Sequence, residues 1–516
     1  MARVQSQLLL GQRRWAAGMG GAKGGEAEAA VRSALRGVIE PVTGRSLTSI
    51  GAVRSIIASP DSVRLELDLF VPGYPHEAQV RTDCEARLKA ALPWAERVEV
   101  KAVVGRGAAG ANSKVACLSR VQHVVLVSSC KGGVGKSTVS VNLAMTLAKR
   151  GLKVALLDAD IYGPSLPLLV TPVDATVRRV PDKPGFIQPL ETKEGLKVLS
   201  FGHVNPKAAT GAGGKGAAVM RGPIATRVIN QLIAATEWSD LDYLVIDMPP
   251  GTGDIQITVT QTVSASGAVL VTTPHPLSLA DSAKGLAMFE DLKIKPLAIV
   301  ENMAYFECDH GKVYYPFGLG GRDNFAKVLE RSWKEGRAQG KGGGGGAEVG
   351  ESLEILSRAP MHKIPLSSEI SGSLAANQSV VDFVTDPIVV RQPLDKIAKI
   401  YSALADDVIR EILRQLLDAQ IMPSITYSEQ RGGVVVLRYF EAAKVSEFII
   451  PRTELRTRDA KTGKKLASPL PSIEKDVKPV AFDFKGNYGV AIAWSDGHYA
   501  DIWPFEVLRE LALELA

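Results

Sequence analysis

The residues best suited to chemistry form one short loop that combines glycines with lysines and hydroxyl side chains. Residues 129–138 read SCKGGVGKST and directly follow an apolar run. Glycines let backbone N–H groups curl around a phosphate, and a helix that starts after the loop adds its positive N-terminal end. In such a loop Lys136 reaches the β- and γ-phosphates, and the Ser137 hydroxyl binds Mg²⁺. The pattern predicts a nucleotide-binding loop, although Cys130 stands where the strict phosphate-loop motif has its first glycine.

Three aspartates at the ends of apolar runs supply the carboxylates that such a site needs. Asp247 ends the run 243–246, and Asp158 and Asp160 follow the run 153–157. The carboxyl ends of parallel strands meet at one edge of a sheet, so we expect these side chains near the phosphate loop. A single aspartate at such a place is more typical of a turn or a helix cap. The three together with the loop indicate a nucleotide site in which Asp247 orients Mg²⁺ through water.

Apolar runs with helical patterns between them predict the fold around this loop. Short, continuous apolar runs are typical of strands that are buried on both faces, and the intervening helical patterns imply parallel crossovers. We therefore expect an α/β fold with a doubly wound, mostly parallel sheet. The runs are 123–128, 153–157, 243–246, 268–272 and 297–300.

Two smaller domains are predicted on either side of the sheet domain. The segment before it combines helical patterns with an alternating strand at 62–70, which indicates a small α+β domain. The segment after it has alternating runs at 433–440 and 488–494, which indicate a small β-rich domain. The predicted boundaries are 1–27 for an Arg-bearing transit peptide or a disordered tail, 28–105 for the α+β domain, 106–120 for a linker, 121–395 for the P-loop domain and 400–516 for the β-rich domain.

Composition excludes several classes of protein. The 516 residues carry 61 Lys and Arg against 55 Asp and Glu, and a net charge of +6 is small for this length, which disfavours a nucleic-acid partner. No run reaches the roughly 18 apolar residues of a membrane-spanning helix, so we expect no stable membrane insertion. Four scattered cysteines are typical of a reducing compartment rather than of a disulfide framework.

The phosphate loop also carries a family resemblance. Residues 131–137, KGGVGKS, resemble the deviant Walker A motif of the MinD/Mrp class of P-loop ATPases, which has an extra early lysine. In that class the early lysine, here Lys131, reaches the nucleotide of a dimer partner and acts like an arginine finger. The resemblance implies a homodimer that hydrolyses ATP slowly. The implied ATP-binding residues are Lys131, Gly132, Gly133, Val134, Gly135, Lys136, Ser137 and Thr138.

Other segments that are similar to Mrp proteins imply the remaining roles. Residues 158–165, DADIYGPS, resemble the Mrp switch I and put Asp160 at the position that orients the attacking water. Asn302, in the sequence Val-Glu-Asn-Met, matches a position that contacts adenine. The implied catalytic residues are Lys131, Lys136 and Asp160, and the implied Mg²⁺ ligands are Ser137 and Asp247.

The flanking domains extend the resemblance over most of the chain. Residues 28–105 resemble the SufT/PaaD-type domain of iron–sulfur assembly, and 494–498 and 503–509 resemble the N-terminal domain of γ-butyrobetaine hydroxylase. This arrangement is similar to the plastid high-chlorophyll-fluorescence family of iron–sulfur scaffolds. It implies an ATP-dependent carrier that binds [4Fe–4S] clusters and transfers them to apoproteins. It also implies the chloroplast stroma as the location, with cytoplasm or mitochondrion as the alternatives.

The sequence departs from that family at the expected cluster ligands. Mrp-type carriers have a Cys-x-x-Cys near the end of the P-loop domain, so that two chains supply the four thiolates of a bridging [4Fe–4S] cluster. Here Cys308 is present, but Gly311 stands at the second position. His310 could substitute, as histidine does at Rieske-type irons, although an exposed turn histidine is the simpler interpretation. Cys308 is therefore the one candidate cluster ligand, and the others stay open.

Two other functions remain open at this stage. A positioning ATPase of the MinD or ParA kind would act on membrane or DNA, but the chain ends in the acidic segment 505–515 instead of a basic amphipathic helix. A nucleotide-dependent adaptor without hydrolysis is the other alternative, and it rests on Cys130 in place of the motif's glycine.

Overall fold

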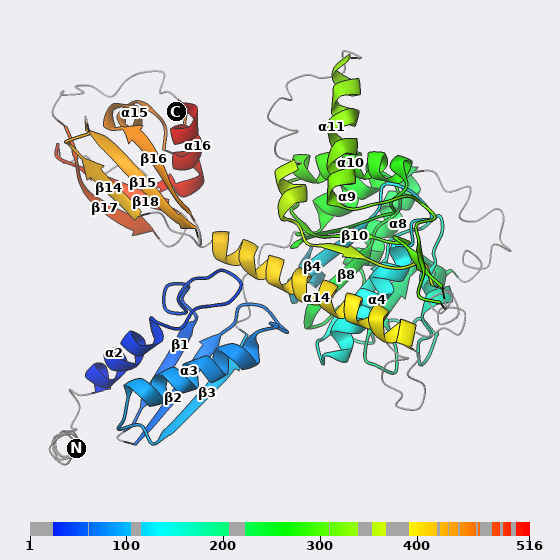
Figure 1. Cartoon of the computed structure of the whole chain (residues 1–516), viewed down its shortest axis with the longest axis horizontal. Helices are drawn as coiled ribbons and strands as arrows, with labels where there is room; N and C mark the ends of the chain where they lie inside the picture. Colours follow the sequence, from blue (N-terminus) through cyan, green and yellow to red (C-terminus); the bar gives the residue numbers. More distant parts are fainter. Residues whose placement is uncertain are drawn as a thin grey trace. The chain divides into compact units, whose positions relative to one another are not determined.

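The computed structural model of the chain resolves into two compact units (Figure 1). The first comprises residues 1–67, 79–101 and 413–516, and the second comprises 68–78 and 102–412. The structure describes residues 24–59, 61–104, 115–205, 222–308, 310–338, 353–367, 392–419, 424–431, 433–441, 444–460, 463–464, 477–485, 489–496 and 502–515. Most of the predicted tail 1–27 and of the linker 106–120 lies outside these residues, and the three-domain boundaries stay a prediction.

An eight-stranded sheet forms the centre of the second unit. Neighbouring strands pair in parallel except for the antiparallel pair at one edge. In order across the sheet the strands are β13 (Met361–Lys363), β10 (Pro296–Glu301), β9 (Gly267–Thr272), β4 (Val121–Ser128), β8 (Leu241–Asp247), β5 (Val154–Asp158), β7 (Lys197–Ser200) and β6 (Leu190–Glu191). The five apolar runs are β4, β5, β8, β9 and β10, so the predicted α/β fold with a mostly parallel sheet is confirmed.

The direction of the chain across the sheet explains why the sheet is doubly wound. From β4 the chain passes to β5 and β7 on one side, returns to β8, and then crosses to β9 and β10 on the other side. Right-handed crossovers in two opposite directions place helices on both faces of a sheet. Ligands of such sheets bind at the carboxyl ends of the strands near the reversal, which is where β4 and β8 lie.

Helices and one hairpin connect the strands. The helix after β4 is almost entirely buried, and Val, Leu and Ala make up much of its buried face. The hairpin of β11 and β12 follows β10 and is antiparallel. The connecting elements are α4 (Lys136–Lys149), α5 (Leu166–Leu169), α6 (Phe201–Val204), α8 (Gly222–Ala234), α9 (Asp254–Thr262), α10 (Pro276–Asp291), β11 (Phe306–Glu307), β12 (Val313–Tyr314) and α11 (Arg322–Ala338).

The first unit holds three small sheets. β1 (Val53–Ala58), β2 (Ser62–Asp68) and β3 (Arg97–Val103) form one sheet, accompanied by α2 (Gly24–Leu35) and α3 (Glu77–Ala91), as the α+β prediction requires. The β-rich prediction for the C-terminal part is also confirmed. Its elements are β14 (Ser424–Ser428), β15 (Val434–Glu441), β16 (Lys444–Pro451), α15 (Arg452–Thr457), β17 (Pro479–Lys485), β18 (Gly489–Trp494), β19 (Trp503–Pro504) and α16 (Phe505–Leu515).

A long helix, α14 (Gln392–Ala419), continues from the second unit into the first. Its part within the second unit is fixed to the end of α4, because Arg150 donates to Asp406 at 2.7 Å and to the carbonyl of Ser402 at 2.9 Å. Among the helices that the structure describes, none is long and apolar enough to cross a membrane.

Candidate functional site

The loop after β4 has the backbone that phosphate binding requires. Gly133 and Gly135 adopt φ of +78° and +83°, a left-handed conformation that glycine adopts without strain. Gly135 is the N-cap of α4, and no side chain caps the helix there. The first N–H groups of α4 therefore keep their capacity to bind an anion, and the helix dipole favours negative charge at that point.

Lys136 and Asp247 form a buried ion pair at the centre of the site. The Lys136 ammonium donates to Oδ1 of Asp247 at 2.6 Å and to the Ser137 hydroxyl at 3.3 Å. Ser140 donates to the same carboxylate oxygen at 2.7 Å. Lys136 and Asp247 are only 6% and 2% exposed. The structure thus brings together the predicted phosphate lysine and both predicted Mg²⁺ ligands, from the start of α4 and the end of β8.

Asp158 lies at the expected edge of the sheet, where its carboxylate binds the backbone of the following segment. It is 1% exposed and lies opposite Asp247 in the β5–β8 register. Its carboxylate accepts hydrogen bonds from the backbone N–H groups of Asp160, Ser165 and Leu166 and from the Ser200 hydroxyl, at 3.0–3.1 Å. Asp158 therefore holds the segment 158–166 in place.

The carboxyl groups of Asp158 and Asp160 lie in different electrostatic environments. Burial, and then the nearby charge of Asp247, raise the pKa of Asp158 to about 7. Asp160 is half-buried beside it, and its Oδ1 accepts from the N–H of Gly163 at 3.1 Å. Burial also raises the pKa of Asp160, while Lys136 opposes that rise. Asp160 thus lies at the same edge with part of its surface open to solvent, which suits a residue that orients water.

Asn302 contacts the phosphate loop directly, a contact that the sequence did not reveal. Its Nδ2 donates to the Val134 carbonyl at 2.8 Å, and the residue is 7% exposed. A Cβ atom on Gly135 would lie 2.2 Å from that nitrogen, so only glycine fits there. Asn302 therefore fixes the loop from the end of β10, and its predicted contact with adenine stays a prediction.

Cys130 packs away from the phosphate loop, against α10. A Cβ atom placed on Gly285 would lie 2.2 Å from the Cys130 sulfur, so the thiol occupies space that the helix leaves free at this glycine. Burial raises the pKa of the Cys130 thiol to about 12, which keeps it protonated. The missing first glycine of the motif is thus compensated by a glycine in α10, and Cys130 gives no reason to exclude a functional loop.

Cys308 lies in the turn between β11 and β12. It is half-buried, its N–H donates to the Lys312 carbonyl at 3.0 Å, and its own carbonyl accepts from Gly311 at 2.8 Å. Gly311 has a φ of +74°, a conformation that would strain a cysteine. The conformation of this turn therefore suits the glycine that stands at the second position of the Cys-x-x-Cys motif. His310 is exposed in the same turn.

Cys84 and Cys117 are unsuited to bind an iron–sulfur cluster. Cys84 is fully buried in α3, and burial raises its pKa to about 12. Cys117 donates to the Ile233 carbonyl at 3.0 Å, and burial raises its pKa to about 11. Within the described part of the chain, no three His, Cys, Asp or Glu side chains gather where they could hold a metal. One chain therefore offers Cys308 without a complete set of cluster ligands among these residues.

Large apolar side chains are exposed on the β11–β12 hairpin that carries Cys308 and in the segment that follows it. Between about two-fifths and two-thirds of each is exposed, which is unusual for large apolar residues this close together in the sequence. They are Phe306, Val313, Tyr314, Tyr315 and Leu319.

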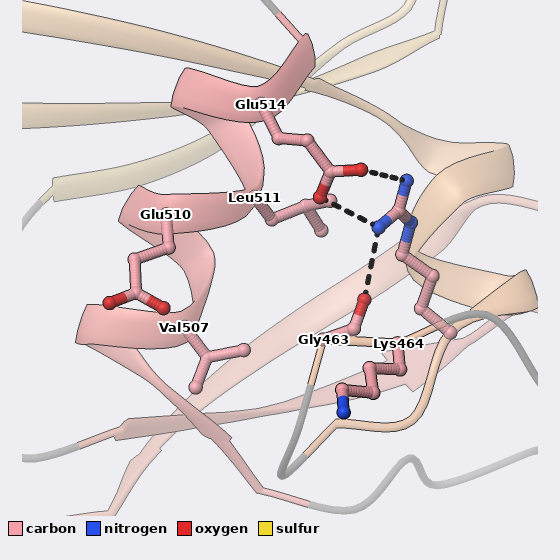
Figure 2. Close-up of a pocket in the computed structure, with 7 residues that line it drawn as sticks. Gly463, Lys464, Val507, Glu510, Leu511 and Glu514 are labelled. Carbon is pink, nitrogen blue, oxygen red and sulfur yellow. Dashed lines mark hydrogen bonds and ion pairs between the residues drawn. The ribbon is translucent and has the colours of Figure 1, made fainter. Parts of the chain in front are cut away.

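A pocket of about 350 Å³ in the C-terminal part of the first unit contains none of the predicted site residues (Figure 2). Its most buried cation is already neutralised, because Arg458 donates to Glu514 at 2.9 and 3.2 Å and to the Gly463 carbonyl at 3.1 Å. We assign it no part in the site. It is lined by Arg458, Gly463, Lys464, Val507, Glu510, Leu511 and Glu514.

Cys130 and Gly285 should behave as a compensating pair. Gly285→Ala places a methyl group on the Cys130 sulfur and should displace the phosphate loop, with an overpacking cost of about 1–3 kcal/mol in nucleotide binding or stability. Cys130→Gly in the same chain removes the clash and should restore both nucleotide affinity and thermal stability. Titration with a fluorescent nucleotide, together with thermal unfolding of the two single variants and the double variant, measures this. Wild-type behaviour of Gly285→Ala alone would contradict the packing argument.

Three family models match the chain in succession. "NUBPL iron-transfer P-loop NTPase" matches residues 120–333, "Iron-sulfur cluster assembly protein" matches 28–102, and "Gamma-butyrobetaine hydroxylase-like, N-terminal" matches 445–509. Among solved structures, a nucleotide-binding protein from Archaeoglobus fulgidus in complex with ADP is 32% identical, with a TM-score of 0.37, over 51% of this chain and 89% of that one. The cell division ATPase MinD of Pyrococcus furiosus is 20% identical, with a TM-score of 0.36, over 55% of this chain and 98% of that one.

One relative matches nearly the whole chain, and another matches three quarters of it. The chloroplastic Fe-S cluster assembly factor HCF101 of Arabidopsis thaliana is 35% identical over 93% of this chain and 82% of its own length. The iron-sulfur cluster carrier protein of Escherichia coli is 32% identical over 75% of this chain and 93% of its own length. With that identity and coverage, the chain belongs to the HCF101 family of Fe–S cluster assembly factors, which are P-loop NTPases.

Proposed function

We propose that this protein is an ATP-dependent carrier that binds a [4Fe–4S] cluster and transfers it to apoproteins. The observation that carries the proposal is the convergence of Lys136, Ser137 and Asp247 beneath an uncapped helix start, in a chain whose P-loop unit also presents Cys308 on an apolar hairpin. The names of the relatives support the same cargo.

The nucleotide site accounts for ATP and Mg²⁺. Hydroxyl and carboxylate oxygens are the ligands that Mg²⁺ prefers, and Ser137 and Asp247 supply one of each. Bound Mg²⁺ would neutralise charge on the phosphates. Lys136 breaks its ion pair with Asp247 and binds the β- and γ-phosphates instead. Asp160 accepts a hydrogen bond from the attacking water and orients it.

Slow hydrolysis and dimerisation complete the proposal. Lys131 is half-buried in the loop and makes no ion pair with any of the described residues. In a homodimer its ammonium reaches the partner's nucleotide, so hydrolysis stays slow until the second chain binds. Two chains also bring two copies of Cys308, so a bridging cluster would have these two thiolates and would take its remaining ligands from other groups.

The apolar hairpin suits the handover of a cluster. Exposed aromatic and aliphatic side chains around a ligating thiol form a surface that another protein can cover, and covering excludes water from the cluster during transfer. The chloroplastic relatives support the plastid as the place of action.

Hydrolysis should depend on Lys136. Lys136→Ala removes the ammonium that stabilises charge on the transferred phosphate, so the steady-state ATPase rate should fall by roughly 100-fold or more. Lys153→Ala, an exposed lysine before β5, is the matched control and should leave the rate unchanged. Unchanged turnover in Lys136→Ala would exclude the assigned site.

Cluster binding should depend on Cys308. Anaerobic reconstitution with iron and sulfide should give a visible chromophore and about four irons per dimer. Cys308→Ala should abolish both, whereas Cys117→Ala, which removes a thiol hydrogen-bonded to a carbonyl, should keep them. A chromophore that survives in Cys308→Ala would place the ligands elsewhere, and a wild-type protein without a chromophore would contradict the proposed cargo.

A further inference from the structure

The end of β10 contacts two loops that the proposed function uses separately. Glu301 is the last residue of β10, and Asn302 follows it. The Asn302 side chain binds the phosphate loop through the Val134 carbonyl at 2.8 Å. The Glu301 side chain binds the loop that follows the Cys308 hairpin, because its Oε1 accepts from the N–H of Gly321 at 2.8 Å. Two adjacent residues thus hold the nucleotide loop and the hairpin loop.

Glu301 is enclosed by the loop that it binds. It is 0% exposed, and a Cβ atom on Gly320 would lie 2.0 Å from its Oε1, so the loop closes on the carboxylate only because Gly320 has no side chain. Its Oε2 has no hydrogen-bond partner in the described part of the chain, and the nearest cation is the Lys363 ammonium at 3.7 Å. A buried carboxylate held by so few donors is costly. The hydrogen bond to Gly321 is therefore sensitive to small shifts of the strand end.

Both ends of the β11–β12 hairpin lead to Glu301 and Asn302. The first strand is joined to Asn302 by three residues, and the last of these, Tyr305, is held by the segment after β13, because Leu366 donates to the Tyr305 carbonyl at 2.7 Å. The second strand returns through residues 315–320 to Gly321, which Glu301 holds. Asn302 and Cys308 are six residues apart, so even a fully extended chain separates them by at most about 20 Å.

Met303, which directly follows Glu301 and Asn302, has an unusual backbone conformation. Met303 has a φ of +55°, which non-glycine residues seldom adopt, and its terminal methyl lies 3.7 Å from where a Cβ on Gly135 would be. Such conformations persist where the surroundings impose them, and they cluster at switch regions. A movement of the phosphate loop therefore reaches the hairpin through a short and tightly held connection.

We propose that Glu301 and Asn302 couple the nucleotide site to the Cys308 hairpin, so that nucleotide binding changes the exposure of the Cys308 thiol. The proposal rests on the proposed function for nucleotide binding, but it needs no cluster. Glu301 is a positioning residue here: it acts on Cys308 through Gly320 and Gly321, and it touches neither nucleotide nor cargo.

The test measures the alkylation rate of Cys308 by N-ethylmaleimide in the full-length, cluster-free chain, with each cysteine followed by mass spectrometry of its own peptide. In the wild type, Mg²⁺ with ADP or a non-hydrolysable ATP analogue should change this rate at least about fivefold, in the range of ordinary allosteric coupling. Glu301→Ala and Gly320→Ala should reduce the change to below about twofold, while fluorescent-nucleotide affinity stays within about threefold of wild type.

Matched controls separate coupling from general damage. Glu301→Gln keeps an acceptor for Gly321 and should retain part of the nucleotide response. Glu307→Gln makes the same change on the hairpin itself, where Glu307 pairs with the exposed Lys396 at 3.3 Å, and should keep the full response. Thermal unfolding reports whether the buried substitutions fold.

The outcomes are distinguishable. A wild-type chain that binds nucleotide without any change in Cys308 alkylation overturns the coupling and leaves the proposed ATP site standing, even if no variant folds. Variants of Glu301 and Gly320 that keep the full nucleotide response overturn the assignment to these residues. A wild-type chain that binds no nucleotide overturns the proposed function and the coupling together.

Discussion

The buried ion pair between Lys136 and Asp247 is the contact on which the site depends. It joins the first residue of α4 to the last residue of β8, and Ser140 adds a second donor to the same oxygen. Neither charge is stable alone at this depth, because a buried ion that loses its partner keeps its full desolvation cost. The pair thus holds the start of α4 on the edge of the sheet, and in the proposed site nucleotide phosphates would replace Asp247 as the partner of Lys136.

The neighbouring carboxylate makes that exchange favourable. Asp158 lies opposite Asp247 in the register of the sheet, and its pKa is raised first by its burial and then by the nearby charge of Asp247, which the Lys136 ammonium opposes. Mg²⁺ would add the missing positive charge at the moment when Lys136 turns to the phosphates. The same edge of the sheet continues to β10, where Glu301 and Asn302 extend the network toward the hairpin of Cys308. In our proposal, nucleotide chemistry and cargo are thus connected through the ends of parallel strands of one sheet.

The features that could be predicted from the sequence are those that a short stretch of residues determines by itself. Continuous apolar runs identified the five long strands, and the glycines and lysines of residues 131–138 identified the loop. In the second unit the sequence did not reveal β6, β7, β13 and the β11–β12 hairpin, since strands of two to four residues show no periodicity. In the first unit it also missed the longer strands β1, β14, β16 and β17. It also missed the contacts of Asn302 with Val134 and of Cys130 with Gly285, because each depends on how distant segments pack. Asp158 was predicted beside the site, but its role as an acceptor for segment 158–166 required the fold.

If nucleotide controls the release of an iron–sulfur cluster, as we propose, the rate of cluster transfer to an apoprotein must depend on nucleotide. Reconstituted protein would be mixed anaerobically with an apoprotein whose activity requires a [4Fe–4S] cluster, with and without Mg²⁺ and ATP, and recovery of that activity would be followed in time. The account predicts that Mg²⁺ and ATP change the transfer rate by at least about fivefold, the lower end of typical coupling between sites. Transfer at the same rate with and without nucleotide, by protein that hydrolyses ATP, would contradict it.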